Sequence, residues 1–144
     1  MKILMVCLGN ICRSPLAHGI LAHLVTEKGL SWQVDSAGTG DWHTGEAPDK
    51  RAIAVAATYG VDIANQKAQW FEPHLFDKYD QILVMDKNNL KDVLAQARSA
   101  ADSNKVSLFL GTGEVTDPYF DSNLFEPVYQ LIEKRCQELM QAWS

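Results

Sequence analysis

A cysteine and an arginine that are separated by five residues follow a short apolar run at the start of the chain. Cys7 ends the run MKILMVC, and Arg13 comes just before Ser14 and Pro15. Successive backbone N–H groups in a strand-to-helix loop can bind an anion, and the arginine fork matches two oxygens of a phosphate. The same positive field favours the thiolate, so Cys7 could attack a phosphorus atom held above it.

The other residues of this loop suit a tight bend around a phosphate group. Gly9 permits close approach, and Asn10 tolerates the left-handed region of backbone conformation. The hydroxyl of Ser14 can donate to the sulfur, cap the helix that Pro15 begins, or do both. The predicted phosphate-binding segment comprises Leu8, Gly9, Asn10, Ile11, Cys12, Arg13 and Ser14.

A second segment, TDPYFD, carries a candidate acid for the leaving group. An alkoxide or phenoxide leaves poorly at neutral pH unless it receives a proton, and Asp117 could supply one and then activate the hydrolytic water. Pro118 stiffens the turn, Tyr119 could form an aromatic wall, and Asp121 is less well placed. The alternative for Asp117 is a simple turn residue, because Asp-Pro is common in turns.

The pattern of apolar residues predicts the elements that must position these loops. The predicted strands are Lys2–Val6, Trp32–Ser36, Gln81–Met85 and Val106–Leu110, and the predicted helices are Pro15–Lys28, Pro48–Tyr59, one capped by Asp86, and Leu124–Met140. We therefore expect a single α/β domain over residues 1–144, a Rossmann-like three-layer sandwich whose four-stranded parallel sheet has helices on both faces. The carboxyl ends of its strands bring the loops to one edge.

Composition narrows the function further. The 144 residues carry a net charge of −5, which argues against a nucleic-acid partner, and no apolar run is long enough to span a membrane. Three cysteines suggest free thiols in a reducing cytoplasm, and their spacing does not match a metal site. We expect a cytoplasmic monomer that needs no cofactor or metal. Cys136 is expected in the core.

Four segments in this order resemble the low-molecular-weight protein tyrosine phosphatases: VCLGNICRSP, SAGTGDWHTG, VMDKNNL and DPY. The resemblance implies that Cys7 is the nucleophile, Arg13 the phosphate-binding arginine and Asp117 the general acid. It also implies a polar network that supports the loop, aromatic walls of the substrate cleft, and a second loop cysteine that can form a reversible disulfide with Cys7. The residues in these roles are Asn10, Ser14 and Ser36; Trp42 and Tyr119; and Cys12.

The resemblance further implies the reaction and its partners. The expected substrates are phosphotyrosine proteins, a cognate tyrosine kinase among them, and small aryl phosphates, with inorganic phosphate as a product inhibitor. The sequence departs from the family at three positions near the site. His18 stands where many relatives carry an acidic residue that faces the mouth of the site, Gln66 lies near a common histidine position, and Gln69 replaces a common arginine.

Two rival functions share the same loop. Thiol-dependent arsenate reductases need further cysteines near the third strand, and residues 80–94 contain none. A phosphate-binding module without activity would be expected to lose the nucleophile or the acid, and the chain has both. Among the other charged residues, Asp86 is expected to be a helix cap, and Asp49, Lys50 and Arg51 are expected to form a solvated helix face.

Overall fold

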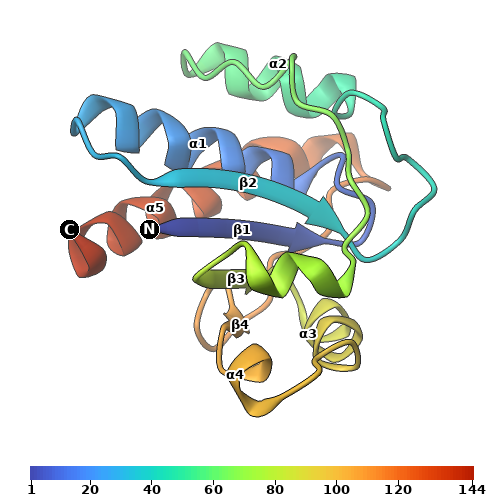
Figure 1. The fold of residues 1–144 in the computed structure, drawn as a ribbon. Helices are drawn as coiled ribbons and strands as arrows, with labels where there is room; N and C mark the ends of the chain where they lie inside the picture. Colours follow the sequence, from blue (N-terminus) through green and yellow to red (C-terminus); the bar gives the residue numbers. More distant parts are fainter.

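The computed structural model describes residues 1–144, and its four strands form one parallel sheet in the order β2-β1-β3-β4 (Figure 1). The strands are β1 (Lys2–Cys7), β2 (Gln33–Gly38), β3 (Gln81–Val84) and β4 (Val106–Leu108). Because β1 pairs in parallel with both β2 and β3, the loops that follow these three strands emerge at the same edge of the sheet.

Helices cover both faces of this sheet, as the sequence predicted. One side carries α1 (Arg13–Glu27), α2 (Lys50–Thr58) and α5 (Phe125–Trp143) (Figure 1). The other side carries the 3-10 helix η1 (Pro73–Asp77), α3 (Lys87–Leu94) and α4 (Ala100–Ser103), and a short 3-10 helix η2 (Ser122–Leu124) precedes α5. The α/β fold with a four-stranded parallel sheet is therefore confirmed.

The first strand is buried on both faces, which is why its sequence is an uninterrupted apolar run. Ile3 and Met5 belong to the cluster that includes side chains of α1 and α5, whereas Leu4 and Val6 belong to the cluster that includes η1 and β3. All four side chains are fully buried. β1 thus fixes Cys7, its last residue, against a rigid centre of the fold.

The predicted strands and helices are present in the structure, but most of their ends differ by one to three residues. The predicted strand Trp32–Ser36 extends to Gly38, because Gly38 pairs with Cys7 and also bridges to Trp70. The predicted strand Val106–Leu110 ends at Leu108, where a turn begins in which the Gly111 N–H donates to the Leu108 carbonyl.

The start of α1 corrects one prediction. The helix begins at Arg13 with Cys12 at the N-cap, and no side chain caps it. Ser14 therefore lies inside the first turn, where its hydroxyl bonds to other side chains instead of the free backbone N–H groups. Asp86 caps α3 as predicted, whereas Asp49, which was expected on a solvated helix face, caps α2.

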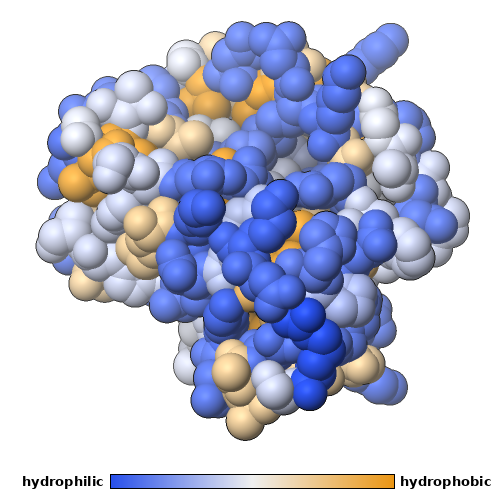
Figure 2. Space-filling model, viewed as in Figure 1, coloured by the Kyte–Doolittle hydropathy of each residue, from blue (hydrophilic) through white to orange (hydrophobic).

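The surface seen in the same orientation is mostly hydrophilic, and its apolar areas are small and separate (Figure 2). None of the helices combines the length and apolar character that crossing a membrane requires. The exposed large apolar side chains include four that lie around the loops at the carboxyl edge of the sheet: Leu8, Trp42, Tyr119 and Phe120.

Candidate active site

Cys7 lies at the floor of a pocket at the carboxyl edge of the sheet. Its side chain is almost fully buried, and its sulfur lies 3.0 Å from the hydroxyl oxygen of Ser14. The Asn10 side-chain amide donates to that same oxygen at 2.8 Å. Because the amide occupies one lone pair of the hydroxyl, Ser14 can direct its own proton at the sulfur and stabilise a thiolate there.

The loop after Cys7 is held by its carbonyl groups and leaves its N–H groups free. The carbonyl oxygens of Cys7, Leu8 and Ile11 accept hydrogen bonds from the backbone N–H groups of Thr39, Gly40 and Asp49 at 2.8 to 2.9 Å. In contrast, the N–H groups of residues 8–14 donate to no acceptor within the chain. A run of unpaired N–H groups at a helix N-terminus is a site for an anion.

Backbone conformation explains how the loop bends so tightly. Asn10 has a φ of +57°, so it occupies the left-handed region that the sequence predicted for it. Its side chain is tied down at both ends, because Oδ1 accepts from the Gln69 backbone N–H at 2.9 Å while Nδ2 donates to Ser14. These bonds hold a conformation that a non-glycine residue adopts only at a cost.

Arg13 reaches the site from the first turn of α1 and is 3% exposed. Its Nη1 donates to Asp86 Oδ2 at 2.7 Å and to the Val115 carbonyl at 3.0 Å, which fixes the plane of the guanidinium. Burial alone would lower the pKa of Arg13, but the charge of Cys7, the bond to Asp86 and the charge of Asp117 together raise it. The arginine therefore stays charged inside the pocket.

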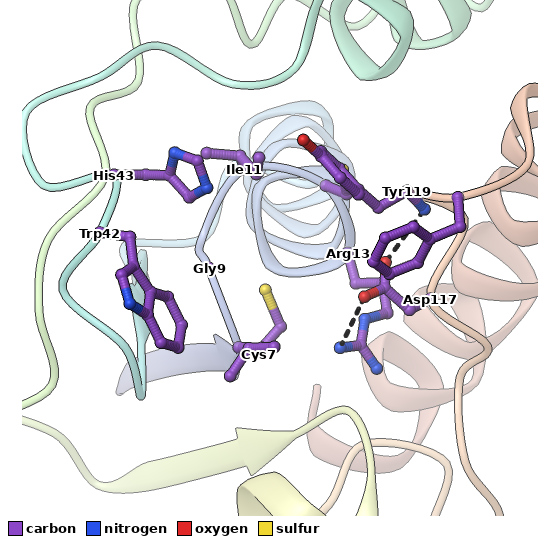
Figure 3. A pocket seen from close by; sticks show the side chains of 11 residues that line it. Cys7, Gly9, Ile11, Arg13, Trp42, His43, Asp117 and Tyr119 are labelled. Carbon is purple, nitrogen blue, oxygen red and sulfur yellow. Dashed lines mark hydrogen bonds and ion pairs between the residues drawn. The ribbon is translucent and has the colours of Figure 1, made fainter.

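Asp117 stands opposite Trp42 across the sulfur (Figure 3). Its Oδ2 lies 3.8 Å from Nη2 of Arg13, and its Oδ1 accepts from the Tyr119 backbone N–H at 3.1 Å. Tyr119 is half-exposed beside it, and the Trp42 indole is 66% exposed on the other side. Gly40 leaves room for that indole, because a Cβ at Gly40 would lie 1.9 Å from the ring.

The pocket brings together most of the residues that the sequence singled out and two to which it gave no role there, His43 and Phe120. Asp86, predicted as a helix cap, lies outside the lining and bonds to Arg13. His43 pairs with Glu46 through Nδ1 at 3.1 Å, and its ring lies close to Gly9. The lining comprises Cys7, Leu8, Gly9, Ile11, Cys12, Arg13, Trp42, His43, Asp117, Tyr119 and Phe120, of which seven are hydrophobic.

Two predicted placements differ from the structure. Ser36 was expected in a network with Asn10 and Ser14, but its hydroxyl bonds to His18 Nδ1 at 3.0 Å. It reaches the loop only through Gln69, whose side chain donates to the Ser36 carbonyl at 2.9 Å. His18 was expected at the mouth of the site, yet it does not line the pocket. Burial lowers the pKa of His18, so the ring is held in its neutral form.

Cys12, Cys136 and Gln66, which the sequence also singled out, have local packing or hydrogen-bonding roles. Burial, followed by the charges of Asp49 and Cys7, raises the pKa of Cys12, which keeps this thiol protonated in the pocket wall. Cys136 is completely buried in the core. Gln66 donates to the Pro15 carbonyl at 3.1 Å. The structure contains no group of three or more histidine, cysteine, aspartate or glutamate side chains that could hold a metal ion.

Comparison with known proteins was consistent with this geometry. The family model described as low molecular weight phosphotyrosine protein phosphatase matches residues 2–144. The low molecular weight phosphotyrosine protein phosphatase of Sus scrofa is 34% identical over 97% of this chain and 94% of that protein.

Two solved structures are similar to the whole fold. The Bacillus subtilis protein YfkJ superposes with a TM-score of 0.91 at 32% identity, over 99% of this chain and 93% of that one. Vibrio vulnificus Wzb, in complex with benzylphosphonate, superposes with a TM-score of 0.88 at 34% identity, over 98% of this chain and 97% of that one.

Proposed function

The chain belongs to the low molecular weight phosphotyrosine protein phosphatases, and from this premise we propose that its reaction proceeds through a phosphocysteine on Cys7. It is an enzyme of the phosphoric monoester hydrolase type. The observation that carries the proposed mechanism is the run of unpaired N–H groups at residues 8–14, which surrounds a buried sulfur beside Arg13. Such a site binds a phosphate dianion directly over a nucleophile.

In the first step the Cys7 thiolate attacks phosphorus, so the S–P bond forms as the bond from phosphorus to the aryl oxygen breaks. Asp117 gives its proton to the departing oxygen. Arg13 and the loop N–H groups balance the charge on the equatorial oxygens, and the fixed guanidinium plane makes this stabilisation preorganised.

In the second step a water molecule attacks phosphorus while Asp117 accepts the proton of the water. The S–P bond then breaks, and the sulfur leaves as a thiolate that the Ser14 hydroxyl stabilises. Inorganic phosphate is released from the same cradle. We therefore expect phosphate to compete with substrate as a product inhibitor.

The apolar walls support an aryl phosphate as the substrate. Trp42 and Tyr119 stand on opposite sides of the sulfur (Figure 3), and Leu8 and Ile11 add apolar surface to the lining of the same pocket. The similar Vibrio vulnificus protein binds benzylphosphonate, whose aromatic ring would fit such walls. Phosphotyrosine proteins, a cognate tyrosine kinase among them, are the proposed physiological substrates.

Other features of the proposal concern the state of the protein. Cys7 and Cys12 are both free thiols that line the pocket, which supports Cys12 as the partner in a reversible disulfide that protects Cys7 from further oxidation. Free thiols also favour a reducing, cytoplasmic environment. We propose that residues 1–144 act as one catalytic domain, since the chain itself supplies every group of the mechanism, and that this domain is a monomer.

The acid assignment is tested by leaving groups of different quality. Asp117→Asn should lower kcat/KM for phenyl phosphate about 100-fold, and much less for p-nitrophenyl phosphate, whose leaving group needs little help from a proton. Asp121→Asn is the matched control, because Asp121 caps η2 and does not line the pocket. An equal loss for both substrates in Asp117→Asn would contradict the assignment.

A further inference from the structure

We propose that Arg51 is a positioning residue for Asp117, and this inference rests on the proposed role of Asp117 as general acid. Arg51 is the second residue of α2 and was expected to be a solvated charge. Its guanidinium instead joins the phosphate-binding loop to the segment that carries Asp117. No hydrogen bond joins Arg51 to the nucleophile or to the phosphate cradle, so its main effect should be on the acid.

The guanidinium is first fixed on its own helix. Arg51 Nε donates to Asp49 Oδ1 at 3.0 Å, and Nη2 donates to Asp49 Oδ2 at 2.9 Å. Asp49 also caps α2, and its backbone N–H donates to the Ile11 carbonyl at 2.8 Å. The arginine is therefore held at a fixed place relative to the phosphate-binding loop.

From that place Arg51 reaches the acid segment. Nη2 donates to the Tyr119 carbonyl at 3.0 Å, and Nη1 donates to the Ser122 hydroxyl at 2.9 Å. The guanidinium carbon also lies 4.6 Å from the centre of the Phe125 ring and 5.5 Å from that of the Tyr119 ring. The Arg51 guanidinium thus contacts residues 119–125, the part of the chain that follows Asp117, through two hydrogen bonds and two aromatic rings.

Apart from the 3.8 Å ion pair between Asp117 and Arg13, the acid segment has few long-range polar contacts. Among residues 116–121, the bond from Arg51 to Tyr119 is the only hydrogen bond that reaches a distant part of the chain. The others are local, such as the bond from the Asp121 N–H to the Pro118 carbonyl. Pro118 is buried, but Tyr119 and Phe120 are exposed. Without Arg51, the carboxyl of Asp117 would lose its fixed distance from the leaving oxygen.

The test measures kcat/KM for phenyl phosphate and for p-nitrophenyl phosphate in Arg51→Met. A displaced acid should lower the value for phenyl phosphate about 10-fold, because a small misplacement removes part of the acid's contribution. The value for p-nitrophenyl phosphate and the inhibition constant of inorganic phosphate should stay within about twofold. Lys50→Met is the matched control, since it removes a positive charge from the same turn and should change none of these values.

Two further variants test whether Arg51 acts through its geometry rather than its charge, and whether it acts through Asp117. Arg51→Lys should behave like Arg51→Met, because an ammonium cannot span Asp49, Tyr119 and Ser122 together. In an Asp117→Asn background, Arg51→Met should cause no further loss with phenyl phosphate. Thermal unfolding of each variant confirms that it is folded at the assay temperature.

The outcomes are distinct. An equal loss for both substrates, full activity in Arg51→Lys, or an undiminished loss in the Asp117→Asn background would overturn the inference and leave the acid assignment intact. If the loss of kcat/KM in Asp117→Asn is the same for both leaving groups, Asp117 is not the general acid, and the inference fails with that assignment. A selective loss with phenyl phosphate that disappears in the double variant establishes the positioning role.

Discussion

Replacing Ser14 with alanine should slow the breakdown of the phosphocysteine while leaving its formation detectable. The Ser14 oxygen lies 3.0 Å from the Cys7 sulfur, and the Asn10 amide fills the other side of that hydroxyl. In the second chemical step the sulfur departs as a thiolate, so a hydrogen bond to it is strongest when its charge is greatest. Removing the hydroxyl therefore raises this barrier more than it weakens phosphate binding.

The size of the effect follows from the charge on the acceptor. A hydrogen bond to a charged group contributes about 1.5 to 3 kcal/mol, which corresponds to roughly 10- to 150-fold in rate. The fully buried Ser14 site cannot offer the sulfur a water molecule in its place without rearrangement. Ser14→Ala also leaves the Asn10 amide without its acceptor, so we expect the free energy of unfolding to fall by about 1 to 3 kcal/mol.

The assay is a rapid-quench experiment with p-nitrophenyl phosphate, which releases p-nitrophenol in a burst if the second step limits turnover. Ser14→Ala should keep the burst amplitude and lower the steady-state rate within the range given above. Ser36→Ala is the control, because this serine bonds to His18 and not to the sulfur. A steady-state rate within twofold of the native enzyme, or equal losses in the two serine variants, would refute the reasoning.

Two further predictions concern stability. Asp86→Asn should keep the cap of α3 but lose the charged bond to Arg13, which should lower the free energy of unfolding by about 2 kcal/mol. Asp86→Ala removes the cap as well and should lower it further; thermal unfolding measures both. His18 is buried with a lowered pKa, so below about pH 6.5 the unfolded chain binds a proton that the folded protein does not. Stability should therefore fall as the pH drops below that value, and His18→Gln should reduce this dependence in unfolding curves at pH 7.5 and pH 5.5.

The sequence predicted the fold because its signals are strong and local. A buried parallel strand appears as an uninterrupted apolar run, and β1 is such a run with all its central side chains fully buried. Parallel strands also bring their following loops to one edge, so Cys7, Arg13 and Asp117 could be placed together before their distances were known. Their proximity in the structure results from topology.

The arrangement around the catalytic groups depends on contacts that the sequence does not show. Arg51 bonds to a carbonyl 68 positions away, and a carbonyl has no residue type by which it could be recognised. Asp86 was predicted as a cap, and the structure adds its bond to Arg13 across 73 positions. Each of these side chains has an ordinary local role, which conceals the long-range one.

Ser14 shows that tertiary contacts can override a local helix-capping preference. A serine before a proline is a typical helix cap, yet α1 begins two residues before Pro15, at Arg13, so that Ser14 lies inside its first turn. The hydroxyl then lies beside the sulfur and serves the site instead of the helix. Ser36 was assigned to the same network by resemblance, but its hydroxyl bonds to His18, and only its carbonyl accepts a hydrogen bond from Gln69.

The most direct test of the whole account is to trap the covalent intermediate. The enzyme is mixed with ³²P-labelled p-nitrophenyl phosphate in the presence of a chelator, quenched in acid within one turnover, and digested for identification of the labelled peptide. The account predicts phosphate on Cys7, present at the same level in Cys12→Ser and absent in Cys7→Ser. Turnover without any labelled cysteine, or turnover that survives in Cys7→Ser, would contradict it.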